Sequence, residues 1–247
     1  MGPGRMMSAH LYNSRLGKIS WFVRRFGLSE LFCLPLRKLF SPWVCPRLQP
    51  RTFRFRDRDW DCFYHDYNVT WCNERCVEVP VGLEYLERFA GKAVLEVGNV
   101  LSHYESGGHT VLDKYERAPG IVNEDIVGYQ PANPFDLVLS LSTLEHIGFD
   151  DDAPGESGEK ILEAIGACRA LLATGGLFAF TVPLGYNSDL DRLIADNALG
   201  ADREWFLKRS GPRDWAEAPR AEAQGAAYRR PYPYANALLI AEYDKAN

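Results

Sequence analysis

The chain has 247 residues and a net charge of −5, with 25% charged and 13% aromatic residues. This composition is typical of a globular protein and excludes a disordered or collagen-like chain. The length suits one α/β domain with an extension better than two full domains, and such a domain needs no disulfide bonds to be stable.

The six cysteines do not follow a zinc or disulfide pattern. Only Cys72 and Cys76 lie close together in the sequence, no second pair completes a zinc set, and His65 is the one nearby histidine. We therefore expect free thiols in a reducing cytoplasm and no metal site. The acidic run 150–152 is interpreted as solvated charge rather than as a metal site.

Charge is distributed unevenly along the chain. Residues 1–56 contain eleven Lys and Arg against one acid, Glu30, so this segment carries +10 and residues 57–247 carry −15. We predict a basic, aromatic extension over residues 1–56 and an α/β domain over residues 57–247. A basic arm on an acidic body indicates an anionic partner for the arm.

Residues 10–45 of the extension are predicted to contact a membrane peripherally, because aromatic and basic residues alternate there as in interfacial segments. The alternative is a helical cap packed on the domain. No apolar run is long enough to span a membrane, and arginine pairs interrupt any signal peptide. The expected location is the cytoplasm. A helix is predicted over 11–28, and four prolines are expected to limit helix length further on: Pro35, Pro42, Pro46 and Pro50.

Strands alternate with helices from residue 80 onward. Helices are expected over 80–89, 159–172 and 190–197, with Pro80 in the first turn of the first one. Strands are expected over 93–98, 110–113, 121–122, 136–141, 177–182, 204–208 and 237–243. This alternation predicts a doubly wound, mostly parallel sheet with right-handed crossovers, whose ligands bind beyond the carboxyl ends of the strands.

Residues with chemical function gather where these strands are expected to end. Glu96 and Gly98 end the strand 93–98, and Asp113 ends the next strand. The segment 142–147 follows the strand 136–141, and the segment 124–126 follows the short strand 121–122. Because parallel strands bring their carboxyl ends to one edge, these residues are expected to share a site.

The order of these motifs resembles class I S-adenosylmethionine-dependent methyltransferases across residues 75–183. The resemblance is carried by five segments: VLEVGN, VLDKYE, NEDI, FDLVLSLSTLEHIG and LLATGGLFAFTVP. It implies a Rossmann-like methyltransferase fold, S-adenosyl-L-methionine as cofactor and methyl transfer as the reaction.

The resemblance also assigns roles to single residues. Glu96 and Gly98 belong to the cofactor loop, where glycine lets backbone approach a ligand closely. Asp113 resembles the acid that accepts bonds from the ribose hydroxyls, and Asp125 resembles the acid that meets the adenine amino group. Further cofactor contacts are expected from Ile126, Leu144 and Glu145. Three plainer interpretations stay open: Asp113 as a loop acid, Asp125 as a helix cap, and residues 74–75 as a surface ion pair rather than a lid.

The cofactor loop departs from the family pattern. Val100 and Ser102 stand where further glycines are common, so a catalytically inactive cofactor-binding fold that acts as an interaction module is the alternative function. Val100 also disfavours a dinucleotide, because a pyrophosphate needs close backbone approach.

For an active enzyme, the expected reaction is O-methylation of a small molecule or glycan. His146 and His103 are the candidate general bases, since a neutral imidazole accepts a hydroxyl proton near pH 7, although His146 could instead be structural. Tyr186 is expected to shape the acceptor pocket. A nucleic-acid acceptor is disfavoured, because no Asn/Asp-Pro-Pro-Tyr/Phe motif follows the strand 136–141.

Overall fold

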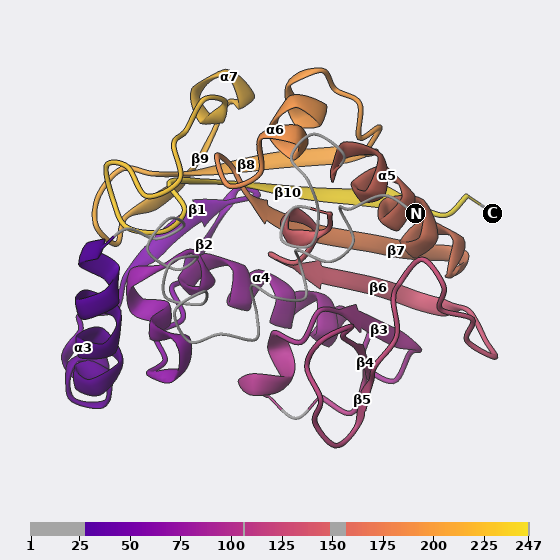
Figure 1. The fold of residues 1–247 in the computed structure, drawn as a ribbon, viewed down its shortest axis with the longest axis horizontal. Helices are drawn as coiled ribbons and strands as arrows, with labels where there is room; N and C mark the ends of the chain where they lie inside the picture. Colours follow the sequence, from indigo (N-terminus) through magenta and orange to yellow (C-terminus); the bar gives the residue numbers. More distant parts are fainter. Residues whose placement is uncertain (1–27, 106, 149–156, 247) are drawn as a thin grey trace, which may run out of the picture. The chain divides into compact units, whose positions relative to one another are not determined.

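The computed structural model describes residues 28–105, 107–148 and 157–246 (Figure 1). The predicted helix over 11–28 and the acidic run 150–152 therefore lie outside the described residues, apart from residue 28. The chain divides into two units, one of residues 1–49 with 64–69 and one of residues 50–63 with 70–247. The predicted division at residue 56 stays a prediction.

The smaller unit is built around helix α3, Leu28–Val44, which is followed by the 3₁₀ turn η2, Cys45–Arg47. Pro35 and Pro42 both lie inside α3, so the prediction that prolines limit helix length is wrong for these two. Each proline removes only one backbone hydrogen bond, and α3 has 17 residues over which the other bonds continue. Within the described residues, no helix is long and apolar enough to cross a membrane.

The larger unit contains a ten-stranded sheet in the order β2-β1-β9-β8-β10-β7-β6-β3-β4-β5 (Figure 1). The strands are β1 Thr52–Phe55, β2 Arg58–Asp61, β3 Val94–Val97, β4 Thr110–Leu112, β5 Ile121–Val122, β6 Phe135–Leu141, β7 Leu172–Pro183, β8 Arg203–Arg209, β9 Trp215–Ala218 and β10 Ala237–Asp244. The helices are α4 Arg75–Arg88, α5 Ser157–Ala170, α6 Ser188–Ala195 and α7 Arg220–Ala223, with 3₁₀ turns η3 Tyr67–Cys72, η4 Leu101–His103 and η5 Leu144–His146.

Five neighbouring strands of the sheet, β5, β4, β3, β6 and β7, are all parallel. Strand β10 pairs antiparallel with both β7 and β8. In chain order the parallel strands are arranged 3-2-1-4-5, which is the order of the Rossmann sheet up to its fifth strand. The predicted parallel sheet is confirmed for this part of the structure. Its carboxyl ends lie at one edge, where the loops after β3, β4 and β6 leave the sheet.

Helices cover both faces of the sheet. On one face, Ile161 and Ile165 of α5 join Val138, Phe178 and Phe180 of the strands in one core cluster. On the other face, α4 lies so close to β6 that a Cβ on Gly82 would come within 2.7 Å of Leu141. The predicted doubly wound fold is therefore confirmed.

Helix α4 begins at Arg75, five residues before the predicted start. Pro80 therefore lies inside the helix and not in its first turn. A proline at this position cannot donate to the carbonyl of Cys76, four residues earlier. That carbonyl accepts a hydrogen bond of 2.8 Å from the backbone N–H of Phe63 instead. Phe63, from the segment between β2 and η3, thus satisfies the carbonyl that Pro80 leaves without a partner, and the helix continues through the proline.

Candidate cofactor and acceptor site

Gly98 brings the loop after β3 against the loop after β6. Its φ of +84° is a left-handed conformation that favours glycine. A Cβ at this position would lie 2.1 Å from the side-chain oxygen of Thr143, so glycine is also required by close packing. Gly98 and Thr143 therefore place the first and fourth parallel strand ends side by side.

Glu96 organises the rest of this loop from a fully buried position. Its Oε1 accepts hydrogen bonds from the backbone N–H groups of Val100 at 2.8 Å and Leu101 at 2.6 Å. Its Oε2 lies 2.7 Å from Nε2 of His109, a partner that the sequence analysis missed. Both carboxylate oxygens are thus bound by the chain itself, at the start of η4.

The departures from the glycine pattern fit this loop. Val100 is 8% exposed, so its side chain is buried, and its backbone N–H is held by Glu96. Ser102 is exposed and donates a hydrogen bond to the side chain of Asn99. The chain turns here through the single turn η4 of a 3₁₀ helix, for which further glycines are not required.

Asp113 links the loops after β3 and β4. Its Oδ2 accepts a hydrogen bond of 3.2 Å from the backbone N–H of Asn99. Its Oδ1 accepts bonds from the N–H groups of Tyr115 at 2.8 Å and Glu116 at 2.7 Å. An ionised carboxylate offers about four lone-pair sites, so this half-buried side chain keeps acceptor capacity beyond these three bonds.

His103 lies in the same group of side chains. Its Nε2 is 3.2 Å from Nδ2 of Asn99 and 3.4 Å from a carboxylate oxygen of Glu116. Both partners also contact Asp113 through their backbone N–H groups. This candidate base therefore belongs to the β3–β4 side of the site.

Asp125 and Ile126, the residues predicted to meet adenine, differ from each other in their surroundings: Asp125 is paired with a lysine, and Ile126 is buried in the core. Oδ2 of Asp125 lies 3.0 Å from Nζ of Lys114, and Oδ1 accepts a bond from the N–H of Val127. Partial burial raises the pKa of Asp125, but these hydrogen bonds and the lysine charge outweigh it and hold the pKa below its usual range. Ile126 is 6% exposed and packs in the core cluster.

The turn η5 after β6 presents three side chains to different environments. Leu144 is fully buried in the core, Glu145 is 1% exposed, and the side chain of His146 is 46% exposed. Nε2 of His146 lies 3.6 Å from Oε1 of Glu145, and its Nδ1 lies 3.1 Å from the hydroxyl of Tyr186. The rings of Tyr186 and Tyr228 meet edge to face at 5.1 Å.

Burial raises the pKa of Glu145 to about 7, against a lowering by the charge of His146. Its Oε2 is buried and has no hydrogen-bond partner among the described residues. A buried carboxyl with an unused oxygen, next to an exposed imidazole, is typical of sites that hold or transfer a proton. Glu145, His146 and Tyr186 form a connected row that ends at the protein surface.

Buried charges from the start of α4 support this turn. Glu78 accepts bonds from the hydroxyls of Ser142 at 2.5 Å and Thr181 at 2.6 Å. Arg75 lies 3.2 Å from Glu78 and donates to the carbonyl of Leu141 at the same distance. Arg75 is therefore not part of a surface ion pair, because its side chain is only 14% exposed and is held between two elements of the fold.

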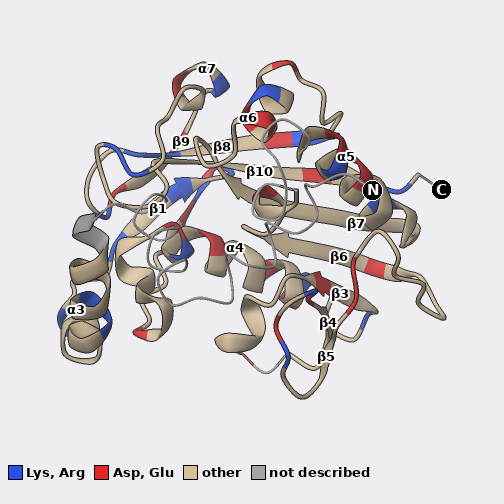
Figure 2. Ribbon diagram, in the orientation of Figure 1, with Lys and Arg blue, Asp and Glu red and all other residues tan. Residues whose placement is uncertain are grey.

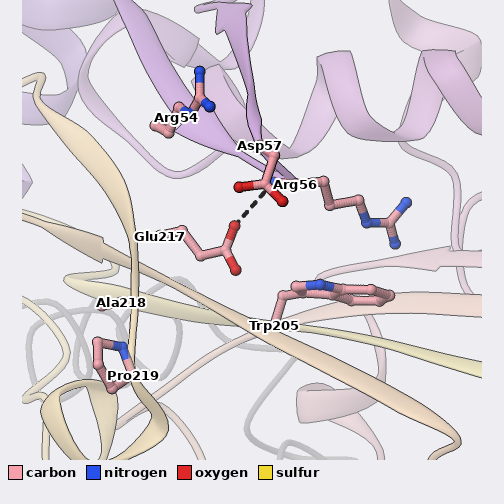
Figure 3. A pocket seen from close by; sticks show the side chains of 7 residues that line it. All are labelled: Arg54, Arg56, Asp57, Trp205, Glu217, Ala218 and Pro219. Carbon is pink, nitrogen blue, oxygen red and sulfur yellow. Dashed lines mark hydrogen bonds between the residues drawn. The ribbon is translucent and has the colours of Figure 1, made fainter.

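A separate cavity of about 740 Å³ opens between β1, β8 and β9 (Figure 3). The guanidinium of Arg56 lies 3.9 Å from the ring centre of Trp205 and donates to Tyr85 and Glu242, while its backbone N–H donates to Glu217. Arg56 and Glu217, two polar residues of its wall, thus have partners within the fold. None of the residues predicted from the sequence to bind cofactor or acceptor lines it: Arg54, Arg56, Asp57, Trp205, Glu217, Ala218 and Pro219 form the wall.

No protein-family model matches the chain, and no curated protein matches it in sequence. Solved structures that align with it include N-methyltransferase NodS from Bradyrhizobium japonicum WM9 with S-adenosyl-L-homocysteine, at 13% identity over 70% of this chain and 92% of that chain, with a TM-score of 0.42. Magnesium protoporphyrin IX methyltransferase ChlM from Synechocystis PCC 6803, with bound SAM, aligns at 16% identity over 66% and 77%, with a TM-score of 0.35.

CalS10, an amino pentose methyltransferase from Micromonospora echinaspora, aligns at 16% identity over 48% of this chain and 56% of that chain, with a TM-score of 0.34. The fold itself is defined by the strand order and the two helical layers described above. The larger unit thus has the doubly wound, Rossmann-like fold that the sequence predicts.

Proposed function

We propose that the protein is an S-adenosylmethionine-dependent methyltransferase that methylates a hydroxyl group of a small molecule or glycan. The contact between the Asn99 N–H and Asp113 carries this proposal, because it joins the glycine loop to the acid at the next strand end. Together with Thr143 above Gly98, it brings three strand ends to the edge where ligands of such sheets bind.

The residues at this edge fit the cofactor. Asp113 retains acceptor capacity for ribose hydroxyls, and the pair Lys114–Asp125 remains about half exposed beside it. When bound, S-adenosylmethionine supplies a methyl group that is already activated by its sulfonium. The protein then has to orient two reactants, and orientation alone can lower a barrier by about 7–11 kcal/mol.

His146 is the proposed general base. With Nδ1–H donating to the hydroxyl of Tyr186, the half-exposed imidazole accepts the proton of the acceptor hydroxyl at Nε2, and the nearby carboxyl of Glu145 stabilises the resulting imidazolium. Tyr186 holds the ring through Nδ1 and, with Tyr228, offers aromatic surface to the acceptor. His103 is not placed in this row, because its contacts lie on the β3–β4 side.

Calorimetric titration with S-adenosylmethionine tests the proposal. We expect a dissociation constant in the micromolar range, which corresponds to a binding free energy on the order of −8 kcal/mol. The affinity of Asp113→Ala should be at least tenfold weaker. Asp136→Ala is the matched control, because Asp136 also accepts a backbone N–H bond, from Ala93, but at the opposite ends of the strands. Absence of binding by the wild-type chain, or equal affinity in the Asp113 variant, would contradict the proposal.

A screen for transfer of labelled methyl groups then identifies the acceptor. Sugars and phenols are the expected acceptors, and amines are included because they distinguish O-methylation from N-methylation. Cofactor binding without transfer to any acceptor class would favour the inactive cofactor-binding fold instead.

A further inference from the structure

Helix α3 carries an outward-facing apolar stripe. Its members are large and each is more than half exposed: Phe32, Leu36, Leu39, Phe40 and Trp43. At 3.6 residues per turn, these positions fall within about 100° of the helix circumference. The rings of Phe40 and Trp43 are 6.2 Å apart, so the end of the stripe is a continuous aromatic surface.

The stripe is not the packing face of the helix. Ser41, on the opposite side, is fully buried, and Leu31 and Leu34 on that side are half-buried. The buried and half-buried residues of α3 thus lie away from the stripe, which is a separate apolar surface. Contiguous exposed apolar patches of this kind mark sites of interaction with membranes or proteins.

Positive charge lies beside the stripe and at its end. The segment 31–49 carries Arg37, Lys38 and Arg47 (Figure 2), against the single acid Glu30 in the first residues of α3. At 3.6 residues per turn, Arg37 lies about 110° from the middle of the stripe, whereas Lys38 lies about 150° away on the side of Ser41. Arg47 donates a hydrogen bond of 2.6 Å to the carbonyl of Trp43, which keeps its charge at the end of the stripe. The wider segment 1–56 carries +10, as counted above.

We propose that α3 lies on the surface of an anionic membrane, with the apolar stripe inserted at the level of the headgroups and the basic residues near anionic lipids. Interfacial helices combine one apolar face with Lys and Arg on the polar side in this way. A symmetric dimer through the same stripe is disfavoured, because it would bring two strongly basic segments face to face. The proposal does not depend on the methyltransferase activity.

Vesicle flotation of the full chain at low salt tests this proposal. We expect at least a roughly tenfold preference for vesicles of equal parts phosphatidylcholine and phosphatidylserine over phosphatidylcholine alone, and release as salt is raised. The triple variant Phe32→Ser, Leu36→Ser, Trp43→Ser should lose at least about tenfold in binding. Arg37→Glu should weaken binding to the anionic vesicles, because Arg37 is the basic residue of α3 nearer to the stripe.

Leu162→Ser is the matched control, because it removes an exposed apolar side chain from α5 and should float as the wild type does. Circular dichroism and thermal unfolding verify that each variant is folded. The proposal is overturned if the wild-type chain stays unbound with both vesicle types, or if the triple variant floats as well as the wild type. It is also overturned if neither chain floats and light scattering shows that the wild type is an oligomer whereas the triple variant is a monomer.

Discussion

Replacing Glu96 by alanine tests whether this buried carboxylate builds the cofactor loop. The substitution removes the acceptor for the N–H groups of Val100 and Leu101 and leaves both donors buried. It also removes the partner of His109 Nε2. Within the described part of the chain, Glu96 is the acceptor of both N–H groups.

The size of the expected loss of stability follows from the two N–H groups that are left without an acceptor. A buried donor without a partner costs about 1–3 kcal/mol, so Glu96→Ala should lower the free energy of unfolding by about 4 kcal/mol. For a domain of this size, that corresponds to a fall of roughly 8–16 °C in the midpoint of thermal unfolding. Glu96→Gln should recover most of the loss, because its amide oxygen can still accept both bonds.

Urea unfolding followed by circular dichroism measures the free energy directly. Asp136→Ala is a suitable control, because it removes a single exposed bond to the N–H of Ala93 and should cost no more than about 1 kcal/mol. A free energy of unfolding for Glu96→Ala within about 1 kcal/mol of the wild type would refute this account of the loop. In that case the carboxylate would be free to act on the cofactor.

Three further predictions concern the site. Gly98→Ala should reduce both thermal stability and cofactor affinity, because the new methyl group would overlap Thr143 and the backbone has a φ of +84°; a differential scanning and calorimetric profile equal to wild type would count against this. His146→Ala should lower turnover by roughly 10²–10⁴-fold and leave cofactor affinity within a few-fold, whereas loss of stability and affinity together would indicate a structural role. The raised pKa of Glu145, about 7, means that its folded state binds the proton more tightly than the unfolded chain does, so stability is present at low pH and is lost as pH rises from about 4.5 through 7. Relative to Glu145→Gln, the wild type should lose up to about 3 kcal/mol between pH 5 and pH 8 in urea titrations; a difference that does not change with pH would disprove the shift.

The sequence by itself was sufficient for the parallel strands. Strands buried on both faces appear as short continuous apolar runs, and the run at 177–180 is the clearest of them. Asp113 and Gly98 were placed at strand ends by the same local pattern. Their adjacency in the structure follows from parallel pairing, which brings all carboxyl ends to one edge.

The hairpin of β1 and β2 had a local signal that the sequence analysis did not use. Residues 52–55 alternate polar and apolar before Arg56 and Asp57, which both have positive φ, and Trp60 is the buried aromatic residue after this turn. Such a two-residue turn between alternating segments is typical of a hairpin. Phe53 and Phe55 are buried in it, so the chain is part of the sheet before residue 56.

Other features were decided only by the tertiary structure. Pro80 ends or begins a helix by local rules, and it is tolerated inside α4 because Phe63, 13 residues before Cys76 in the chain, supplies the missing partner. The charge state of Glu145 likewise depends on burial by distant segments and on His146. Desolvation and hydrogen bonds between remote parts of the chain are set by three-dimensional packing, so local residue patterns contain no record of them.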